Sequence, residues 1–250
     1  ATVAHKGLGT RADLTGMHCL APGYIAAQID GMREAMGLAT LDAFLIDQPE
    51  VHIPRLGKAE LNRRLQTVFA VLEQAVRQDK IRSYGIATFA GFRVETDDVL
   101  FQSLTSLLAL ADAAARLVNR GDAARHNFRV VQLPFNPVMN EGFTRFSQAT
   151  GQGNVASTLQ AAHQLKIFVM GSHGLAKGRL AISGVDGLRA AMADLANDAQ
   201  RTQQYNRSTP GLGVSLTGIS TPAHLDDLLT VAEQAPLARA DYLQLYRRAE

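Results

Sequence analysis

The amino-acid sequence predicts an α/β fold in the form of a TIM-type (β/α) barrel. Short β-branched or apolar runs alternate with segments of helical period, and this alternation predicts parallel strands joined by helices. Most of these runs carry apolar residues on both faces, which is typical of a parallel sheet covered by helices. Gly7-Leu8-Gly9 lacks the third glycine of a Rossmann phosphate loop. A barrel is therefore favoured over a doubly wound open sheet.

The predicted elements follow one another along the whole chain, so we predict one domain, residues 1–250. The predicted strands are residues 2–4, 41–46, 81–87, 128–133, 167–170 and 214–219. The predicted helices are residues 59–80, 99–118, 157–165 and 225–233. Residues 142–154, with three glycines, and the mostly polar residues 200–211 are predicted to be long loops. Because the alternation continues on both sides of them, neither is a domain linker.

Composition excludes several classes of function. The chain has 250 residues, of which 46% are hydrophobic and 19% charged, so it is a globular protein with enough length to bury a core. The net charge of +2 predicts neither a nucleic-acid partner nor an acidic membrane surface. The single Cys19 excludes an intrachain disulfide and a cysteine-only metal site, and we predict no bound metal. No apolar run is long enough to span a bilayer, and no signal-peptide pattern opens the chain, so the cytoplasm is the expected compartment.

Five segments in order resemble the aldo-keto reductases. The family's fourth strand is similar to LDAFLIDQP, and the entry to its fifth strand is similar to DKIRSYGIAT. Its sixth strand is similar to VQLPFNP, and its seventh strand and following loop are similar to residues 167–180. Residues 207–211 and 218–225 resemble the family's closing segment. Each motif alone is weak, but five in the right order across nearly all of the chain are specific.

The resemblance implies an eight-stranded barrel that binds NADP without a Rossmann domain and reduces a carbonyl. In that family a Tyr donates the proton, assisted by Lys, Asp and His. Lys6 matches the Lys at the end of the third strand, although a solvated lysine explains it equally well. If Lys6 ends the third strand, the strands that carry the Asp and the Tyr precede Ala1, and the barrel is incomplete at its N-terminus. Tyr24, the first tyrosine, falls in a helix or loop after that strand.

The candidate catalytic residues depart from the family pattern. Asp47 replaces the His of the fourth strand, and an ionised carboxylate cannot donate a hydrogen bond to a carbonyl oxygen. Asp47 is therefore expected to pair with Lys6, to act as a general base, or simply to cap the turn before Pro49. His173, which replaces the Ser of a Ser-Pro pair after the seventh strand, is the third catalytic candidate.

The expected cofactor pocket has changed as well. Ala87-Thr88 replaces the Ser-Asn pair that binds the nicotinamide carboxamide, and Ser172 replaces the aromatic residue that stacks on the nicotinamide. Thr221 and Pro222 predict an N-cap and a first helical residue at a phosphate-binding helix start. The resemblance implies the following cofactor-binding residues: Thr88, Gln132, Ser172, Leu175, Gly178, Ser220, Thr221 and His224.

These patterns leave three functions open. The favoured one is an aldo-keto reductase-like protein with an eroded tetrad and nicotinamide site, which binds or converts a small molecule without redox chemistry; NADP is then a doubtful cofactor. The second is an NADP-dependent oxidoreductase that reduces a carbonyl and whose first strands lie upstream of Ala1. The third is a non-catalytic subunit in which a second copy or a partner chain covers an open barrel edge.

Overall fold

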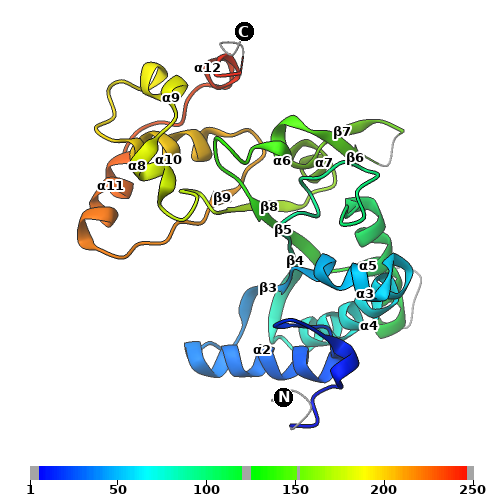
Figure 1. The fold of residues 1–250 in the computed structure, drawn as a ribbon. Helices are drawn as coiled ribbons and strands as arrows, with labels where there is room; N and C mark the ends of the chain where they lie inside the picture. The colour runs from blue at the N-terminus through cyan, green and yellow to red at the C-terminus, as the bar shows by residue number, and fades with distance from the viewer. Residues whose placement is uncertain (1–5, 120–124, 151–152, 247–250) are drawn as a thin grey trace.

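A five-stranded parallel sheet forms the centre of the molecule (Figure 1). A computed structural model of the chain describes residues 6–119, 125–150 and 153–246. The strand order is β3-β4-β5-β8-β9, and all four pairings are parallel. The strands are β3 (Leu41–Asp47), β4 (Ile81–Ala87), β5 (Phe128–Pro134), β8 (Phe168–Ser172) and β9 (Val214–Ser215). The predicted strand at residues 2–4 lies outside the described residues.

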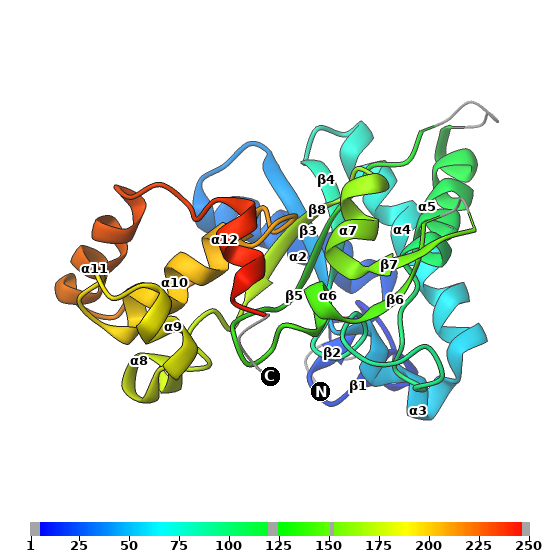
Figure 2. The same ribbon diagram turned by 90° about the horizontal axis from the view of Figure 1, so that it is seen from above.

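Helices and two short hairpins surround this sheet (Figures 1 and 2). Both views show α8, α9, α10 and α11 together beyond β9, whereas α4 and α5 lie near the other end of the sheet. The longer helices are α2 (Pro22–Met36), α4 (Lys58–Arg77), α5 (Leu104–Asn119), α7 (Thr158–Gln164), α10 (Asp198–Ser208) and α11 (Pro222–Ala232). The short helices are η1 (Arg11–Asp13), η2 (Pro49–His52), α3 (Ile53–Leu56), α6 (Glu141–Thr144), α8 (Arg179–Ser183), α9 (Asp186–Ala191) and α12 (Arg239–Gln244). The hairpins join β1 (Leu14–Thr15) to β2 (His18–Cys19) and β6 (Phe146–Ala149) to β7 (Val155–Ser157).

The sheet is an incomplete (β/α) barrel, as the sequence predicts. Among the described strands, β3 pairs only with β4 and β9 pairs only with β8, so both edges stay open. Parallel strands need crossover connections, and α4 and α5 supply the first two of them. The carboxyl ends of all five strands therefore lie at one end of the sheet.

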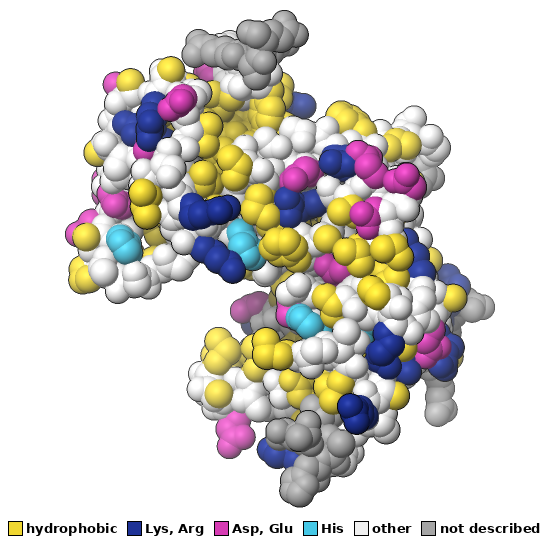
Figure 3. Space-filling view, viewed as in Figure 1, with side chains coloured by type: hydrophobic (Ala, Val, Ile, Leu, Met, Phe, Trp, Pro, Cys, Tyr) yellow, Lys and Arg dark blue, Asp and Glu magenta, His cyan; other side chains and the backbone are white. Residues whose placement is uncertain are grey.

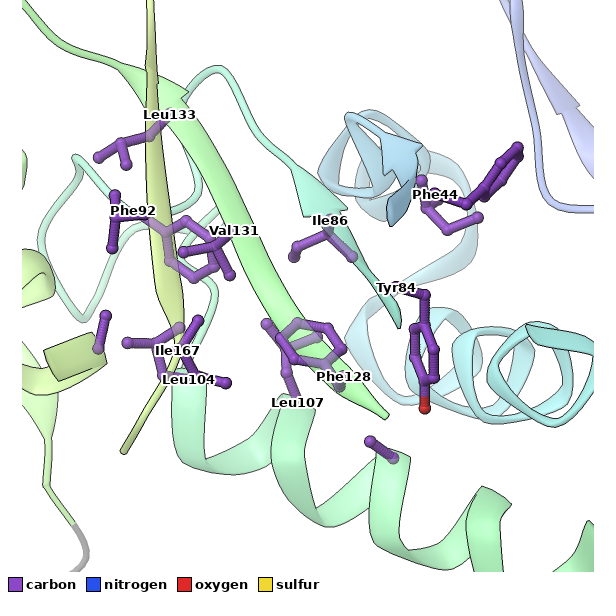
Figure 4. Packing of buried hydrophobic residues seen from close by; sticks show 14 of the residues in the cluster. Phe44, Tyr84, Ile86, Phe92, Leu104, Leu107, Phe128, Val131, Leu133 and Ile167 are labelled. Atoms are coloured by element: carbon purple, nitrogen blue, oxygen red, sulfur yellow. The ribbon is translucent and has the colours of Figure 1, made fainter. Parts of the chain in front are cut away.

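An aromatic cluster between α4 and the sheet forms the densest part of the core. The rings of Phe69, Tyr84 and Phe128 are fully buried, with centroids 5.3 to 5.7 Å apart. Figure 4 shows side chains of β4 and β5 packed with side chains of α5 in the same layer. Phe135 in the loop after β5 is fully buried as well. Burying an aromatic side chain of this kind contributes roughly 1.5–3 kcal/mol.

A polar helix replaces the loop predicted at residues 200–211, so that prediction is wrong. Residues 198–208 form α10, which is buried although most of its side chains are polar. Hydrogen bonds explain this burial: Gln200 Nε2 donates to Asp227 Oδ1 at 3.0 Å, and Asn206 Nδ2 donates to the Gly174 carbonyl at 3.1 Å. Apolar periodicity cannot detect a helix that is buried through side-chain amides.

The other predicted elements need smaller corrections. The loop predicted at residues 142–154 contains β6, which pairs with β7. The strand predicted at residues 214–219 is shorter in the structure, where β9 covers only Val214–Ser215. The strand predicted at residues 167–170 is observed as β8, which extends to Ser172. The helix predicted at 99–118 begins only at Leu104, whereas the other three helices differ from their predicted ranges by at most three residues at either end. No helix among the described residues is long and apolar enough to cross a membrane.

The close approach of β4 and β5 at Gly85 predicts a large effect of a single methyl group. A Cβ atom added to Gly85 would lie 1.6 Å from the Val130 carbonyl oxygen, so Gly85→Ala must separate the two central strands. We expect a loss of more than about 4 kcal/mol in the free energy of unfolding, or no folded protein. Gly187→Ala in α9 is the matched control, because its Cβ atom would meet nothing within 4 Å. Urea denaturation followed by circular dichroism measures both variants, and a near-wild-type Gly85→Ala protein would contradict the strand pairing.

Candidate functional site

The strand register brings two predicted site residues into one row at the carboxyl end of the sheet. Asp47 pairs with Ala87, Ala87 pairs with Gln132, and Gln132 pairs with Met170. Side chains of residues in register on neighbouring parallel strands point to the same face. With a strand spacing of about 4.8 Å, Asp47 and Gln132 lie roughly 10 Å apart. A small molecule can therefore contact both side chains.

The carboxylate of Asp47 contacts a histidine that the sequence does not single out as its partner. Asp47 Oδ2 lies 3.2 Å from Nδ1 of His18 in β2. Lys6 is exposed, and no ion pair within the described ranges joins it to Asp47. The expected Lys6–Asp47 pair is therefore replaced by a His18–Asp47 pair. The catalytic role of Lys6 stays a prediction.

Side chains of α4 and η2 hold the β1–β2 hairpin that carries His18. Thr10 N and Oγ1 donate to the Asp13 carboxylate at 2.8 Å each, and Arg64 on α4 donates to it at 2.9 Å. Burial opposes the shift, but the bonds from Thr10, helped by Arg64, hold the pKa of Asp13 below its usual range. Thr15 Oγ1 lies 2.8 Å from Nδ1 of His52. Burial, helped by the charge of Arg55, lowers the pKa of His52 to about 4. His52 is therefore neutral at pH 7 and supports the hairpin, and it does not join the row at the strand ends.

A buried carboxylate shapes the loop after β4. Glu50 is 2% exposed, and its Oε1 accepts hydrogen bonds from the backbone N–H groups of Phe89 at 2.8 Å and Ala90 at 3.2 Å. Burial raises the pKa of Glu50, and these backbone bonds offset part of the shift. Thr88 N donates to the Gln132 carbonyl at 2.8 Å, which ties the same loop to β5. The hydroxyl oxygen of Thr88 is buried and has no partner within the described part of the chain.

A cavity of about 740 Å³ lies beside the carboxyl ends of β8 and β9, against α8 and α11. Lys177, Asp227 and the apolar Leu216, Ile219 and Leu228 contribute to its wall. Six predicted site residues also line it: Ser172, His173, Leu175, Gly178, Ser220 and His224. The structure thus brings together residues that are up to 52 positions apart in the sequence.

The entrance of α11 has the predicted capping geometry. Thr221 is the N-cap, its Oγ1 accepts a hydrogen bond from His224 N at 3.3 Å, and Pro222 is the first helical residue. Ser220 Oγ lies 3.1 Å from Nδ1 of His224. Both side chains line the cavity, so the helix start faces it. The uncapped N–H groups of such a helix start favour anions.

His173 lies where the cavity meets the loops that follow β4 and β5. Its Nδ1 is 3.2 Å from Ser172 Oγ, and its carbonyl accepts a hydrogen bond from Asn136 Nδ2 at 2.9 Å. Its φ of 57° is left-handed, a backbone conformation that costs a non-glycine residue about 1–3 kcal/mol. Burial lowers the pKa of His173, and the nearby charge of Lys177 lowers it further.

The five tyrosines of the chain lie in three separate places. Tyr84 is buried on the helix side of the sheet, where its hydroxyl donates to Glu73 Oε1 at 2.8 Å. Tyr205, Tyr242 and Tyr246 form a mutually bonded cluster among α10, α12 and the following residues. Tyr24 lies in α2, as predicted for a helix or loop after the third strand. It lines a groove of about 430 Å³ along β3, together with His18 and Asp47.

Sequence reasoning missed two residues of this region. His18 belongs to no motif in the sequence, and no spacing rule places it against Asp47. Phe89 directly follows Thr88 and is 45% exposed, with its ring 5.5 Å from that of His173. An aromatic residue next to a motif position was the one available signal. Within the described ranges, no three His, Cys, Asp or Glu side chains gather as a metal site.

The fold is that of the aldo-keto reductases. The chain is similar to the thermostable aldo-keto reductase Tm1743 in complex with epalrestat, with a TM-score of 0.57 and 14% identity over 88% of this chain and 64% of that one. It is also similar to the aldo-keto reductase AKR11C1 from Bacillus halodurans in its holo form, with a TM-score of 0.59 and 12% identity over 92% and 68%. An aldo/keto reductase from Klebsiella pneumoniae in complex with NADP and acetate gives a TM-score of 0.56 and 17% identity over 88% and 62%.

These similarities concern the fold. The chain spans 64% of the length of the Tm1743 enzyme, which is less than two thirds. No family model and no curated protein matches the sequence. The five-stranded sheet therefore corresponds to an incomplete α/β barrel of the aldo-keto reductase type.

The residues at this site fit one half of a nicotinamide dinucleotide better than the other. On the adenosine and phosphate side, the cavity offers Lys177, His224 and the start of α11. On the nicotinamide side, the buried hydroxyl of Thr88 is out of reach of a ligand, and Ser172 has no ring on which a nicotinamide could stack. Neither Thr88 nor Ser172 therefore offers the carboxamide contact or the stacking ring of the family pattern.

The buried Glu50 predicts a pH dependence of stability. Because its pKa is raised in the folded state, the folded state binds the proton more tightly than the unfolded state does. Its stabilising contribution is complete below the unfolded-state pKa of about 4.3 and is lost as the pH rises through the raised folded-state pKa. The free energy of unfolding of the wild type, minus that of Glu50→Gln, should therefore fall with rising pH across this window. Urea titrations measure the difference, with the exposed Glu34→Gln as control; a flat or rising difference would contradict the burial of Glu50 as an acid.

Proposed function

We propose that this chain is a small-molecule-binding protein on an incomplete aldo-keto reductase barrel, and that its cavity takes the adenosine and phosphate part of a nucleotide. The observation that carries the proposal is the cavity of about 740 Å³, in which six residues selected by family resemblance converge. A volume of this size lies within the range of sites for ligands of several hundred daltons. The similarity to an enzyme in complex with NADP supports a nucleotide as the ligand.

Charge and hydrogen bonding in the cavity agree with a phosphate-bearing ligand. Lys177 is exposed, lines the cavity, and takes part in no ion pair of the described residues. The capped start of α11 adds backbone N–H groups and the positive end of the helix dipole. Asp227 also lines the cavity; its Oδ1 accepts hydrogen bonds from Asn197 at 2.7 Å and Gln200 at 3.0 Å, which orient the carboxylate and leave its negative charge in place.

The chemistry at the strand ends is proposed to be non-redox. His18 and Asp47 form a pair in which the carboxylate contacts Nδ1 of the imidazole. Such a pair leaves Nε2 of His18 to accept or donate a proton, as a general acid or base does. Gln132 stands in the same row and supplies a neutral donor and acceptor. Proton transfer to or from a bound ligand needs no nicotinamide.

Ligand titration by calorimetry tests the assignment of the cavity. We expect ADP and NADPH to bind with dissociation constants within about threefold of each other, and nicotinamide mononucleotide to bind far more weakly. Lys177→Gln should weaken ADP binding by about tenfold or more, the value of one charge-assisted hydrogen bond. Lys166→Gln is a matched control, because Lys166 is also exposed, has a φ of 58° against 59° for Lys177, and lies outside the cavity.

The outcomes separate the alternatives. Absence of ADP binding, or equal effects of the two lysine substitutions, would overturn the cavity assignment. NADPH binding at least a hundredfold tighter than ADP binding, together with oxidation of NADPH by an aldehyde, would instead establish the oxidoreductase function.

A second candidate function, completion of the barrel by another polypeptide, is favoured by the two open edges. A groove of about 430 Å³ follows β3 along residues 43–47, and one of about 460 Å³ follows β9 along residues 212–215. Gln203 Nε2, Asn206 Oδ1 and Thr217 Oγ1 are buried beside the second groove without partners within the described chain. A further strand would supply peptide groups to such edges. Sedimentation of the protein from its native source as a lone monomer of 250 residues would remove this candidate.

A further inference from the structure

An exposed phenylalanine is held in one position at the carboxyl end of the sheet. The backbone N–H of Phe89 donates to the buried Glu50 at 2.8 Å, and its carbonyl accepts a hydrogen bond from Arg93 at 3.3 Å. Arg93 in turn is fixed by two bonds to Glu141 at 2.8 and 2.9 Å, and its guanidinium lies 5.8 Å from the centre of the Phe89 ring. The ring is nevertheless 45% exposed. A buried carboxylate and an arginine thus hold the backbone of Phe89, and its ring packs beside the guanidinium of Arg93 while it stays in contact with solvent.

The second ring of this arrangement belongs to His173. The rings of Phe89 and His173 meet edge to face, 5.5 Å apart at 74°. We call these two residues the aromatic rim. His173 lines the large cavity, so the aromatic rim stands where that cavity opens toward the loops after β4 and β5. Figure 3 shows hydrophobic, basic and histidine side chains gathered on this face of the molecule.

We propose that the aromatic rim binds the ring of a planar aromatic carboxylate, whose charged group pairs with Lys177. Aromatic rings associate with one another edge to face or offset, and an ordered rim does so without losing side-chain freedom on binding. Lys177 lines the same cavity four residues after His173, is exposed, and forms no ion pair among the described residues. Arg93 is unavailable as the anion partner, because Glu141 neutralises it.

This inference deepens the proposed function, because it names a ring-binding subsite at the mouth of the same cavity. It rests on the proposed function in its use of the cavity and of Lys177 as the anion partner, and not on the adenosine part of the ligand. The protonation state of His173 agrees with it: burial and the charge of Lys177 lower the pKa of the imidazole, so the ring is neutral at pH 7 and presents an uncharged aromatic surface.

The test compares two acids that differ only in aromaticity. Naphthoate and its fully saturated analogue carry the same carboxylate and the same carbon skeleton, and calorimetry with the purified chain measures both. We expect naphthoate to bind about fivefold or more tightly than the saturated acid. Phe89→Leu, which keeps apolar bulk and removes the ring, should abolish this preference, and Phe89→Tyr should keep it. Phe146→Leu, at a phenylalanine on β6 that is 66% exposed, is the control and should leave the preference unchanged.

The outcomes distinguish failure of the aromatic rim from failure of the nucleotide assignment. Equal binding of the two acids by the wild type, or a preference that survives in Phe89→Leu, would overturn the aromatic rim. Lys177→Gln should weaken both acids by a similar factor, and a loss restricted to one of them would overturn the placement of the carboxylate. If ADP does not bind but the aromatic preference follows Phe89, the aromatic rim stands and the nucleotide assignment falls. If ADP binds and Phe89→Leu leaves the binding of both acids unchanged, the nucleotide assignment stands and the aromatic rim falls.

Discussion

The carboxylate of Glu73 connects the three elements on which the sheet depends. It projects from α4 and accepts hydrogen bonds from the hydroxyl of Tyr84 on β4 at 2.8 Å and from the backbone and side-chain amides of Asn127, just before β5, at 2.7 Å each. Glu73 is only 1% exposed, and a buried carboxylate without such partners would be strongly destabilising. These three bonds set how β4 and β5 lie along each other. A one-residue slip of either strand would exchange its two faces and break the row at the carboxyl end.

A second buried carboxylate acts at the other end of the same strands. Glu50 follows β3 and binds the backbone of the loop that follows β4, so the ends of two neighbouring strands are tied to each other. This connection between the two strand ends bears on two parts of the site. Toward β3, Asp47 is held opposite His18, and toward β8, Phe89 is held against His173. Binding residues on loops require this kind of support, because a loop without it would lose its geometry to thermal motion.

The sequence was informative wherever apolar burial dictates structure. The predicted ranges 81–87 and 128–133 agree with β4 and β5 to within one residue, because a strand buried on both faces must be a continuous apolar run. The same reasoning failed at α10, where Gln200, Gln204 and Asn206 are buried through hydrogen bonds that no periodicity records. It failed again at His18, because a two-stranded hairpin brings this residue against Asp47 across 29 positions of chain.

Several candidate residues implied by the family resemblance line one cavity, and their binding roles stay predictions. Ser172, Leu175, Gly178, Ser220 and His224 were selected by position alone, and they line one cavity since β8 and β9 are neighbours in a parallel sheet. The changes at Asp47, Ala87 and Ser172 lie at the strand ends, where a nicotinamide would react, whereas the Thr221-Pro222 start of α11 keeps its capping geometry. The parallel pairing of β8 with β9 therefore keeps a ligand-sized cavity beside strand ends whose side chains differ from the family pattern.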